Sequence, residues 1–127
     1  MLGILLLAHG SRDPVWREPV EAVARQIAER EPGVRTRCAY LELAAPDLAT
    51  AAAQLLQDGA TRLRVVPLFL GMGHHVREDL PRRVAQLREL HPGMEIVLRP
   101  AAGQHAGLIR ALASIALEEP GEDRAIP

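Results

Sequence analysis

The chain has 127 residues and a formal net charge of -1 at pH 7, and 48% of its residues are hydrophobic. This length suits one domain with its own apolar core. Near-neutral charge and an aromatic content of 2% provide neither the basic surface nor the stacking rings of a nucleic-acid-binding protein. All 15 basic residues are arginines, which excludes Schiff-base lysine chemistry and a phosphate-loop lysine.

The cellular compartment is indicated by the cysteine content and by the apolar runs. The one cysteine, Cys38, cannot form an intramolecular disulfide, which suits a reducing compartment, and we assign it no role. No run approaches the ~20 apolar residues of a membrane span, and the amino-terminal residues lack the basic start of a secretory signal. We therefore expect a cytoplasmic protein without a nucleic-acid or membrane partner.

Apolar runs of strand character alternate with segments of helical periodicity along the chain. The expected strands are residues 2–8, 34–43, 63–70 and 95–98. This alternation is typical of βαβ units, so we expect a flavodoxin-like α/β three-layer sandwich, with helices flanking a mostly parallel four-stranded sheet. Residues 1–118 are expected to form this single domain, and residues 119–127 a flexible tail.

Capping residues predict the first two helices. Asp13 and Pro14 suit the start of the first helix, although Pro19 allows its regular part to begin one turn later. Asp47 is expected to cap the second helix and Gly59 to end it.

The third and fourth helices follow from apolar positions. Pro81 is expected in the first turn of the third helix, which would leave His74 and His75 on the loop before it. The fourth helix has apolar residues at positions 108, 109, 112 and 115.

Polar residues follow the ends of three expected strands. His9, Gly10, Ser11 and Arg12 come after the first, and Glu42 ends the second. His74 and His75 come after the third. Parallel strands end at the same edge of a sheet, so imidazoles from two loops can converge there on a metal or a reacting atom. A histidine satisfied inside the core is an equally good interpretation of His9 taken alone.

Several assignments stay open at this point. Spacing does not decide which of His74 and His75 faces the crevice, although a helical turn would place His75 on one face with Glu78 and Asp79. Helix capping explains Asp79 better than catalysis. Glu42 suits a general base as well as a solvated charge. Ser11 lacks a nucleophile-elbow context and suits a turn, and His91 suits a helix C-terminus, which excludes it from the site.

Three segments together resemble a known family. They are Leu5-Leu6-Leu7-Ala8-His9-Gly10-Ser11-Arg12-Asp13, Tyr40-Leu41-Glu42 with Pro46, and Val66-Pro67-Leu68-Phe69-Leu70 running into Gly73-His74-His75 and Asp79-Leu80-Pro81. The chain resembles the small, single-domain sirohydrochlorin chelatases of the CbiX type, relatives of anaerobic cobaltochelatase and ferrochelatase. The resemblance implies a chelatase-like fold and ATP-independent insertion of a divalent metal into sirohydrochlorin, for cobalamin or sirohaem-type synthesis. Cobalt is the first expectation, with ferrous iron and nickel as alternatives.

The resemblance also assigns roles to residues. The first family histidine matches His9, and the spacing of Gly73, Asp79 and Pro81 places the second on His75. These two are expected to handle metal and protons, and Glu42 is expected to accept pyrrole protons or to hold the departing metal water. The expected substrate-binding residues are Ser11, Arg12, His74 and Arg77, with Arg82 and Arg83 as further partners for tetrapyrrole carboxylates. His105 lies in a segment that resembles the family's late glycine-containing loop only loosely.

No permanently bound cofactor is expected, because Co²⁺, Fe²⁺ or Ni²⁺ would be a substrate together with the tetrapyrrole. Longer family members have two similar halves, so a homodimer is expected to supply the second wall of the cleft. Two alternatives remain: a non-catalytic metal-binding or delivery module, and a flavodoxin-like binder of anions or nucleotides that uses Gly10 and Ser11.

Overall fold

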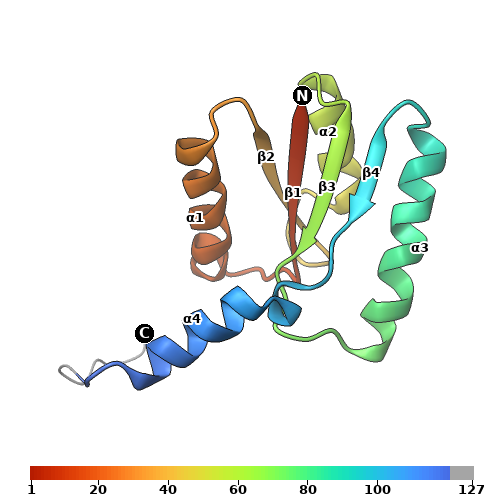
Figure 1. Cartoon of the computed structure of the whole chain (residues 1–127). Coiled ribbons are helices and arrows are strands. Elements are labelled where there is room, and N and C mark those ends of the chain that lie inside the picture. The colour runs from red at the N-terminus through yellow and green to blue at the C-terminus, as the bar shows by residue number, and fades with distance from the viewer. Residues whose placement is uncertain (121–127) are drawn as a thin grey trace.

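In the computed structural model, which describes residues 1–120, four parallel strands form one sheet in the order β2-β1-β3-β4 (Figure 1). The strands are β1 (Leu2–Ala8), β2 (Arg35–Tyr40), β3 (Arg62–Pro67) and β4 (Glu95–Leu98). This architecture confirms the expected parallel α/β sheet. Of the segment expected to be a flexible tail, residues 121–127 lie outside the described part of the chain.

Two strands end earlier than the sequence predicts. β2 stops at Tyr40 instead of residue 43, because Leu43 adopts a left-handed conformation with φ 62° that turns the chain. β3 stops at Pro67 instead of residue 70, and the Phe69 carbonyl beyond it accepts a hydrogen bond from Gly103 at 2.8 Å. Both early ends lengthen the loops at the carboxyl edge of the sheet.

The helices are α1 (Pro14–Arg30), α2 (Leu48–Gln57), α3 (His74–Leu90) and α4 (Ala106–Leu117), with a short 3-10 turn η1 (Ala102–Gln104) before α4. The predicted caps are confirmed: the Asp13 carboxylate accepts from the Val15 N–H, and the Asp47 carboxylate accepts from the Thr50 N–H, each at 2.9 Å. Pro19 lies inside α1, which begins at Pro14.

The predicted start of the third helix was wrong. α3 begins at His74, so both histidines belong to its first turn and Pro81 lies two turns further along. A proline inside a helix leaves the carbonyl four residues earlier without its usual donor. That carbonyl belongs to Arg77, and both Arg77 and Pro81 are exposed, so water can satisfy it. This exposure explains why the helix continues through Pro81.

The two faces of the sheet are covered differently. We call the face that carries Leu5, Leu63 and Val65 the inner face. The core lies between it and two helices, α2 and α3, through Leu55 of α2 and through Leu80, Val84 and Leu87 of α3. At Gly3 a Cβ would lie 3.5 Å from the Leu55 Cβ, so α2 approaches β1 closely.

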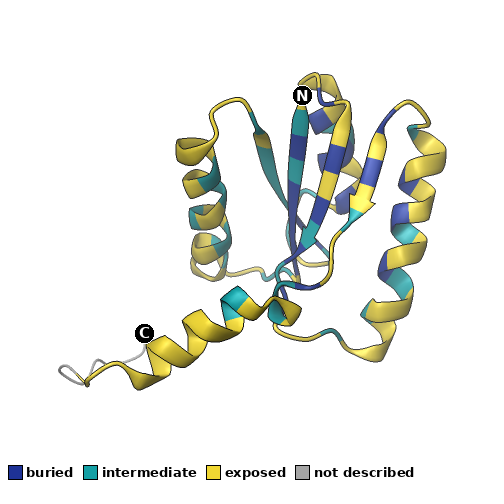
Figure 2. Cartoon of the chain, in the orientation of Figure 1, coloured by how far each residue is buried: buried dark blue, intermediate teal, exposed yellow. Residues whose placement is uncertain are grey.

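The opposite face, here called the outer face, carries the alternate strand residues. α1 packs there against β2 and β1, and the Cys38 thiol of β2 donates to the Val20 carbonyl at 3.8 Å. The apolar residues of α1 are only partly covered, since Trp16 is 39% and Val23 41% exposed. α4 extends away from the sheet, and Figure 2 shows it exposed over most of its length. Within residues 1–120, no helix is long and apolar enough to cross a membrane.

Candidate active site

The loops after β1 and β2 are joined through their backbones. The Leu41 N–H donates to the Ala8 carbonyl and the Glu42 N–H donates to the His9 carbonyl, both at 3.0 Å. Gly10, in the loop after β1, has φ 107°, and a Cβ at this position would overlap the Glu42 carbonyl oxygen. Glycine is therefore required at position 10, both for its conformation and for the close approach of the two loops. This contact holds His9 and Glu42 next to each other.

The His9 imidazole packs against an aromatic side chain from the loop after β3. Its ring centroid lies 4.9 Å from that of Phe69, with an interplanar angle of 50°. Phe69 is 6% exposed and comes two residues after the end of β3, whereas His9 itself is exposed. The interpretation of His9 as a satisfied core histidine is therefore wrong: the ring lies at the carboxyl edge, supported by a buried neighbour.

The two histidines of α3 have different surroundings. The His74 Nε2 lies 3.2 Å from the Glu78 Oε1, with both side chains more than 60% exposed. The His74 and His75 ring centroids are 6.0 Å apart in an edge arrangement. Glu78 thus pairs with His74, which lies one helical turn away.

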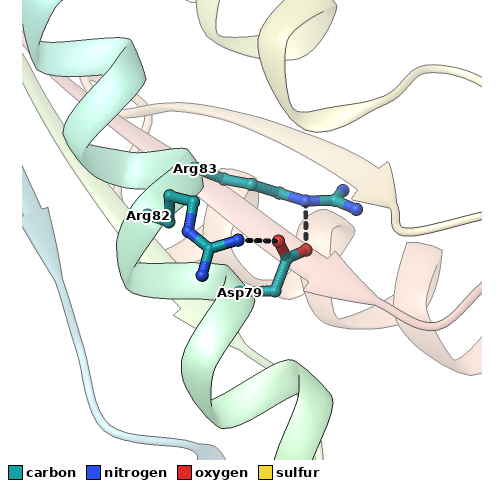
Figure 3. A network of polar contacts seen from close by, with 3 residues as sticks. All are labelled: Asp79, Arg82 and Arg83. Carbon is teal, nitrogen blue, oxygen red and sulfur yellow. Dashed lines mark hydrogen bonds and ion pairs between the residues drawn. The ribbon is translucent and has the colours of Figure 1, made fainter.

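Asp79 holds two arginines on the same helix, as Figure 3 shows. Its Oδ2 accepts from the Arg83 Nε at 2.6 Å, and its Oδ1 lies 3.9 Å from the Arg82 Nη1. α3 begins at His74, and no side chain caps it at the preceding Gly73, so the capping interpretation of Asp79 was wrong. The i, i+3 and i, i+4 spacing of Asp79 to these arginines was a signal that sequence reasoning missed.

The three residues predicted to be catalytic line one cavity. His9, Glu42 and His75 surround a space of about 380 Å³, although they come from the ends of three successive βα units. Its other lining residues are Leu41, Val76, Glu78, Asp79, Leu80, Arg82 and Arg83. The cavity therefore combines imidazoles that can bind a metal, carboxylates that can take a proton, and guanidinium groups that can bind an anion.

Four of the residues predicted to bind substrate lie outside the cavity lining, whereas Arg82 and Arg83 belong to it. In the described part of the chain, the lining of this cavity does not include Ser11, Arg12, His74 or Arg77. The Ser11 hydroxyl accepts from the Asp13 N–H at 3.1 Å, which is the turn role that its context suggested. His105 caps α4, since its Nδ1 accepts from the Gly107 N–H at 3.2 Å.

Shifted pKa values are found away from the cavity. Burial, followed by the nearby Glu21 charge, raises the pKa of the Cys38 thiol, and burial raises the pKa of the Tyr40 hydroxyl. Hydrogen bonds from Thr50 lower the pKa of the capping carboxylate of Asp47. Within residues 1–120, no group of three or more His, Cys, Asp or Glu side chains is arranged to hold a metal ion.

A parallel sheet with a histidine-lined cavity beyond its strand ends defines a protein of the α/β class with a candidate site at the carboxyl edge of its sheet. The sequence profile of the CbiX family matches residues 3–119. The chain belongs to the CbiX family.

Two relatives of the chain are sirohydrochlorin cobaltochelatases. The chain is 38% identical over 80 residues to the sirohydrochlorin cobaltochelatase of Methanosarcina acetivorans, covering 63% of this chain and 62% of that protein. It is 32% identical over 103 residues to the sirohydrochlorin cobaltochelatase of Sulfolobus acidocaldarius, covering 81% of this chain and 80% of that one. The chain thus spans less than two thirds of the length of the Methanosarcina protein.

Two solved structures share the fold. A putative cobalamin biosynthesis CbiX protein from Marinobacter aquaeolei has a TM-score of 0.78 at 35% identity, with 91% of this chain and 94% of that chain covered. The sirohydrochlorin chelatase SirB from Bacillus subtilis, solved with cobalt, has a TM-score of 0.75 at 25% identity. There the match covers 89% of this chain but 48% of SirB.

Proposed function

We propose that this protein inserts a divalent metal ion into sirohydrochlorin without ATP, in cobalamin or sirohaem-type synthesis. The observation that carries the proposal is the convergence of His9, Glu42 and His75 on one cavity. The names of its relatives and the cobalt complex of SirB support both the substrate and cobalt as the first candidate metal. Ferrous iron and nickel are the other candidates, since all three ions accept imidazole ligands.

Metal insertion requires the ion to lose water and two pyrrole nitrogens to lose protons. Neutral imidazoles bind such ions near pH 7, so we assign metal binding and proton handling to His9 and His75. Glu42 is held beside His9 by the backbone bond between their loops, and we assign it the role of accepting pyrrole protons. The metal is a substrate in this scheme, and the protein needs no permanently bound cofactor.

The carboxylates of the tetrapyrrole need cationic partners. Arg82 and Arg83 line the cavity, and Asp79 positions both guanidinium groups. We propose that they bind substrate carboxylates. Ser11, Arg12, His74 and Arg77 remain proposed contacts for the parts of the substrate that reach beyond the cavity.

A cavity of about 380 Å³ in one chain encloses only part of a tetrapyrrole. We therefore propose that the protein acts as a homodimer, in which a second copy supplies the opposite wall.

The reaction can be tested with sirohydrochlorin and Co²⁺ under anaerobic conditions, by following the change in the absorption spectrum against a background without protein. His9→Ala and His75→Ala should each lower the insertion rate by ~10²-fold or more, the size of effect expected for proton transfer and metal positioning. His91→Ala is the matched control, because His91 lies at the end of α3, away from the cavity. Its rate should equal that of the unmodified protein.

Equal rates for all four proteins would reject the catalytic assignment. Metal binding without insertion would favour a metal-delivery module. Tight nucleotide binding that survives His75→Ala would favour a nucleotide-binding protein.

A further inference from the structure

An imidazole and a carboxylate face each other beside the cavity. The His74 Nε2 lies 3.2 Å from the Glu78 Oε1, and the two side chains are 68% and 62% exposed. Glu78 belongs to the lining of the cavity, together with His75, whereas His74 lies outside that lining. The pair therefore spans the boundary between the solution and the cavity, and solvent reaches both of its side chains.

The two acids of this helical turn differ in their partners. Asp79 is bound by two guanidinium groups, those of Arg82 and Arg83, which neutralise its charge (Figure 3). In the part of the chain that the structure describes, the one ion pair of Glu78 is with His74. An imidazole in its neutral form is a metal ligand and not a permanent positive charge. Glu78 thus keeps a carboxylate that can bind a cation, whereas the carboxylate of Asp79 is occupied.

The spacing of the pair suits two ligands of one metal ion. Residues i and i+4 lie on the same face of a helix, and metal-binding helices use this spacing for paired ligands. With metal–ligand bonds of ~2.1 Å, two adjacent ligand atoms lie ~2.9 Å apart in an octahedral site and ~3.4 Å apart in a tetrahedral site. The observed 3.2 Å falls between these values. A hydrated divalent ion can therefore exchange two of its waters for the His74 Nε2 and the Glu78 Oε1 without a change in the helix.

The affinity of the pair for an ion should be low. Within residues 1–120, no group of three or more His, Cys, Asp or Glu side chains is arranged to hold a metal ion, so water must fill the other coordination positions. His74 also lies at the start of α3, where the positive end of the helix dipole weakens cation binding. An ion bound in this way exchanges readily, which suits an ion that is passed on.

The neighbouring imidazole on α3 belongs to the cavity. The ring centroids of His74 and His75 are 6.0 Å apart, and His75 lines the cavity together with His9. An ion held by the pair is therefore adjacent to the residues to which we assign metal binding during insertion.

We propose that His74 and Glu78 form a capture site for a divalent first-row metal ion such as Co²⁺, which binds there before His9 and His75 take it. Binding of the ion by the pair follows from the geometry of α3, and its transfer into the cavity rests on the proposed function. The proposal assigns His74 to the metal substrate and not to the tetrapyrrole.

The first test is a calorimetric titration with Co²⁺ alone. A chain with His9→Ala and His75→Ala, which lacks the proposed metal ligands of the cavity, should still bind one Co²⁺. Adding His74→Ala should weaken this binding by ~10-fold or more, since even the outer-shell partners of a metal contribute that much. Adding Glu78→Gln should do the same, because it removes the charge at nearly constant size. All four residues are exposed, so the circular dichroism spectrum should not change.

Two substitutions at the far end of α3 are the matched controls. Glu89→Gln and His91→Ala remove an acid and an imidazole that lie outside the cavity lining, and each should leave Co²⁺ binding unchanged. The absence of Co²⁺ binding in the chain without His9 and His75, or equal binding after His74→Ala, overturns the proposal and makes the pair a simple surface ion pair.

The second test is the insertion rate at varied Co²⁺ concentration. In the otherwise unmodified protein, His74→Ala should raise the KM for Co²⁺ by ~10-fold, and excess Co²⁺ should restore the rate. A raised KM for sirohydrochlorin with an unchanged KM for Co²⁺ would assign His74 to the tetrapyrrole and overturn the capture role. If the unmodified protein does not insert cobalt, the proposed function fails, and the titration still decides whether the pair binds the ion.

Discussion

The two faces of the sheet differ in how completely one chain covers them. On the inner face, α2 contributes Ala51, Ala52 and Leu55, each with an exposure of 0%. On the outer face, no residue of α1 is buried, and this helix is described in full. The alanines of α2 are fully buried, whereas apolar residues of α1 such as Val20 and Ile27 stay partly exposed. The inner face therefore contributes more of the buried core of the single chain than the outer face does.

The same truncation on the two faces gives the largest predicted difference. Leu55→Ala should lower the free energy of unfolding by about 2–5 kcal/mol, because it leaves a cavity in the core. Leu112→Ala on α4 should cost less than ~1 kcal/mol in dilute protein, where the side chain is already 40% exposed. Urea denaturation at several protein concentrations measures both. Similar losses at all concentrations would remove the distinction between the faces.

Gly10 constrains the two loops that follow β1 and β2 at the carboxyl edge of the sheet. Gly10→Ala should cost about 1–3 kcal/mol, since alanine tolerates φ 107° poorly and its Cβ would displace the Glu42 carbonyl. The insertion rate should fall as well, because His9 and Glu42 would separate. Gly33→Ala is the control, since no atom lies within 4 Å of the added Cβ. A stable, fully active Gly10→Ala protein would show that this contact is dispensable.

The inner face also depends on the start of α2. Asp47→Ala should lower the free energy of unfolding by about 1 kcal/mol through loss of the cap. Hydrogen bonds from Thr50 lower the pKa of Asp47, so its contribution is present above the ordinary aspartate value of 3.8 and is lost as the pH falls below it. Thermal unfolding between neutral and acidic pH should show the two proteins converging in acid. A constant difference would mean that the cap does not act through the carboxylate charge.

The smallest effect concerns Cys38 on the outer face. Burial raises the pKa of its thiol, so the reactive thiolate is scarce at neutral pH. Alkylation by iodoacetamide should be slower in the folded protein than in urea and should leave the insertion rate unchanged. Fast modification of the native protein would show that α1 opens readily from the sheet.

The site was partly predictable from sequence. His9, Glu42 and His75 follow strands that were recognised from their apolar runs, and parallel strands place such residues at one edge. The pairing of Glu78 with His74 was missed because it required the start of α3, which Pro81 obscured. Arg82 and Arg83 were anticipated, but the carboxylate that positions them was interpreted as a cap.

The amino-acid sequence alone determined the order and type of the strands and helices, and the caps at Asp13 and Asp47, because these depend on neighbours a few residues away. Tertiary structure decided where each element lies and what it covers. The contacts at Gly10 and at Gly103 join loops that follow different strands. Local periodicity gives no signal for either contact. For the same reason the apolar positions of α4 predicted a helix but not its place: Gly103 contacts the loop after β3, and α4 extends away from the sheet.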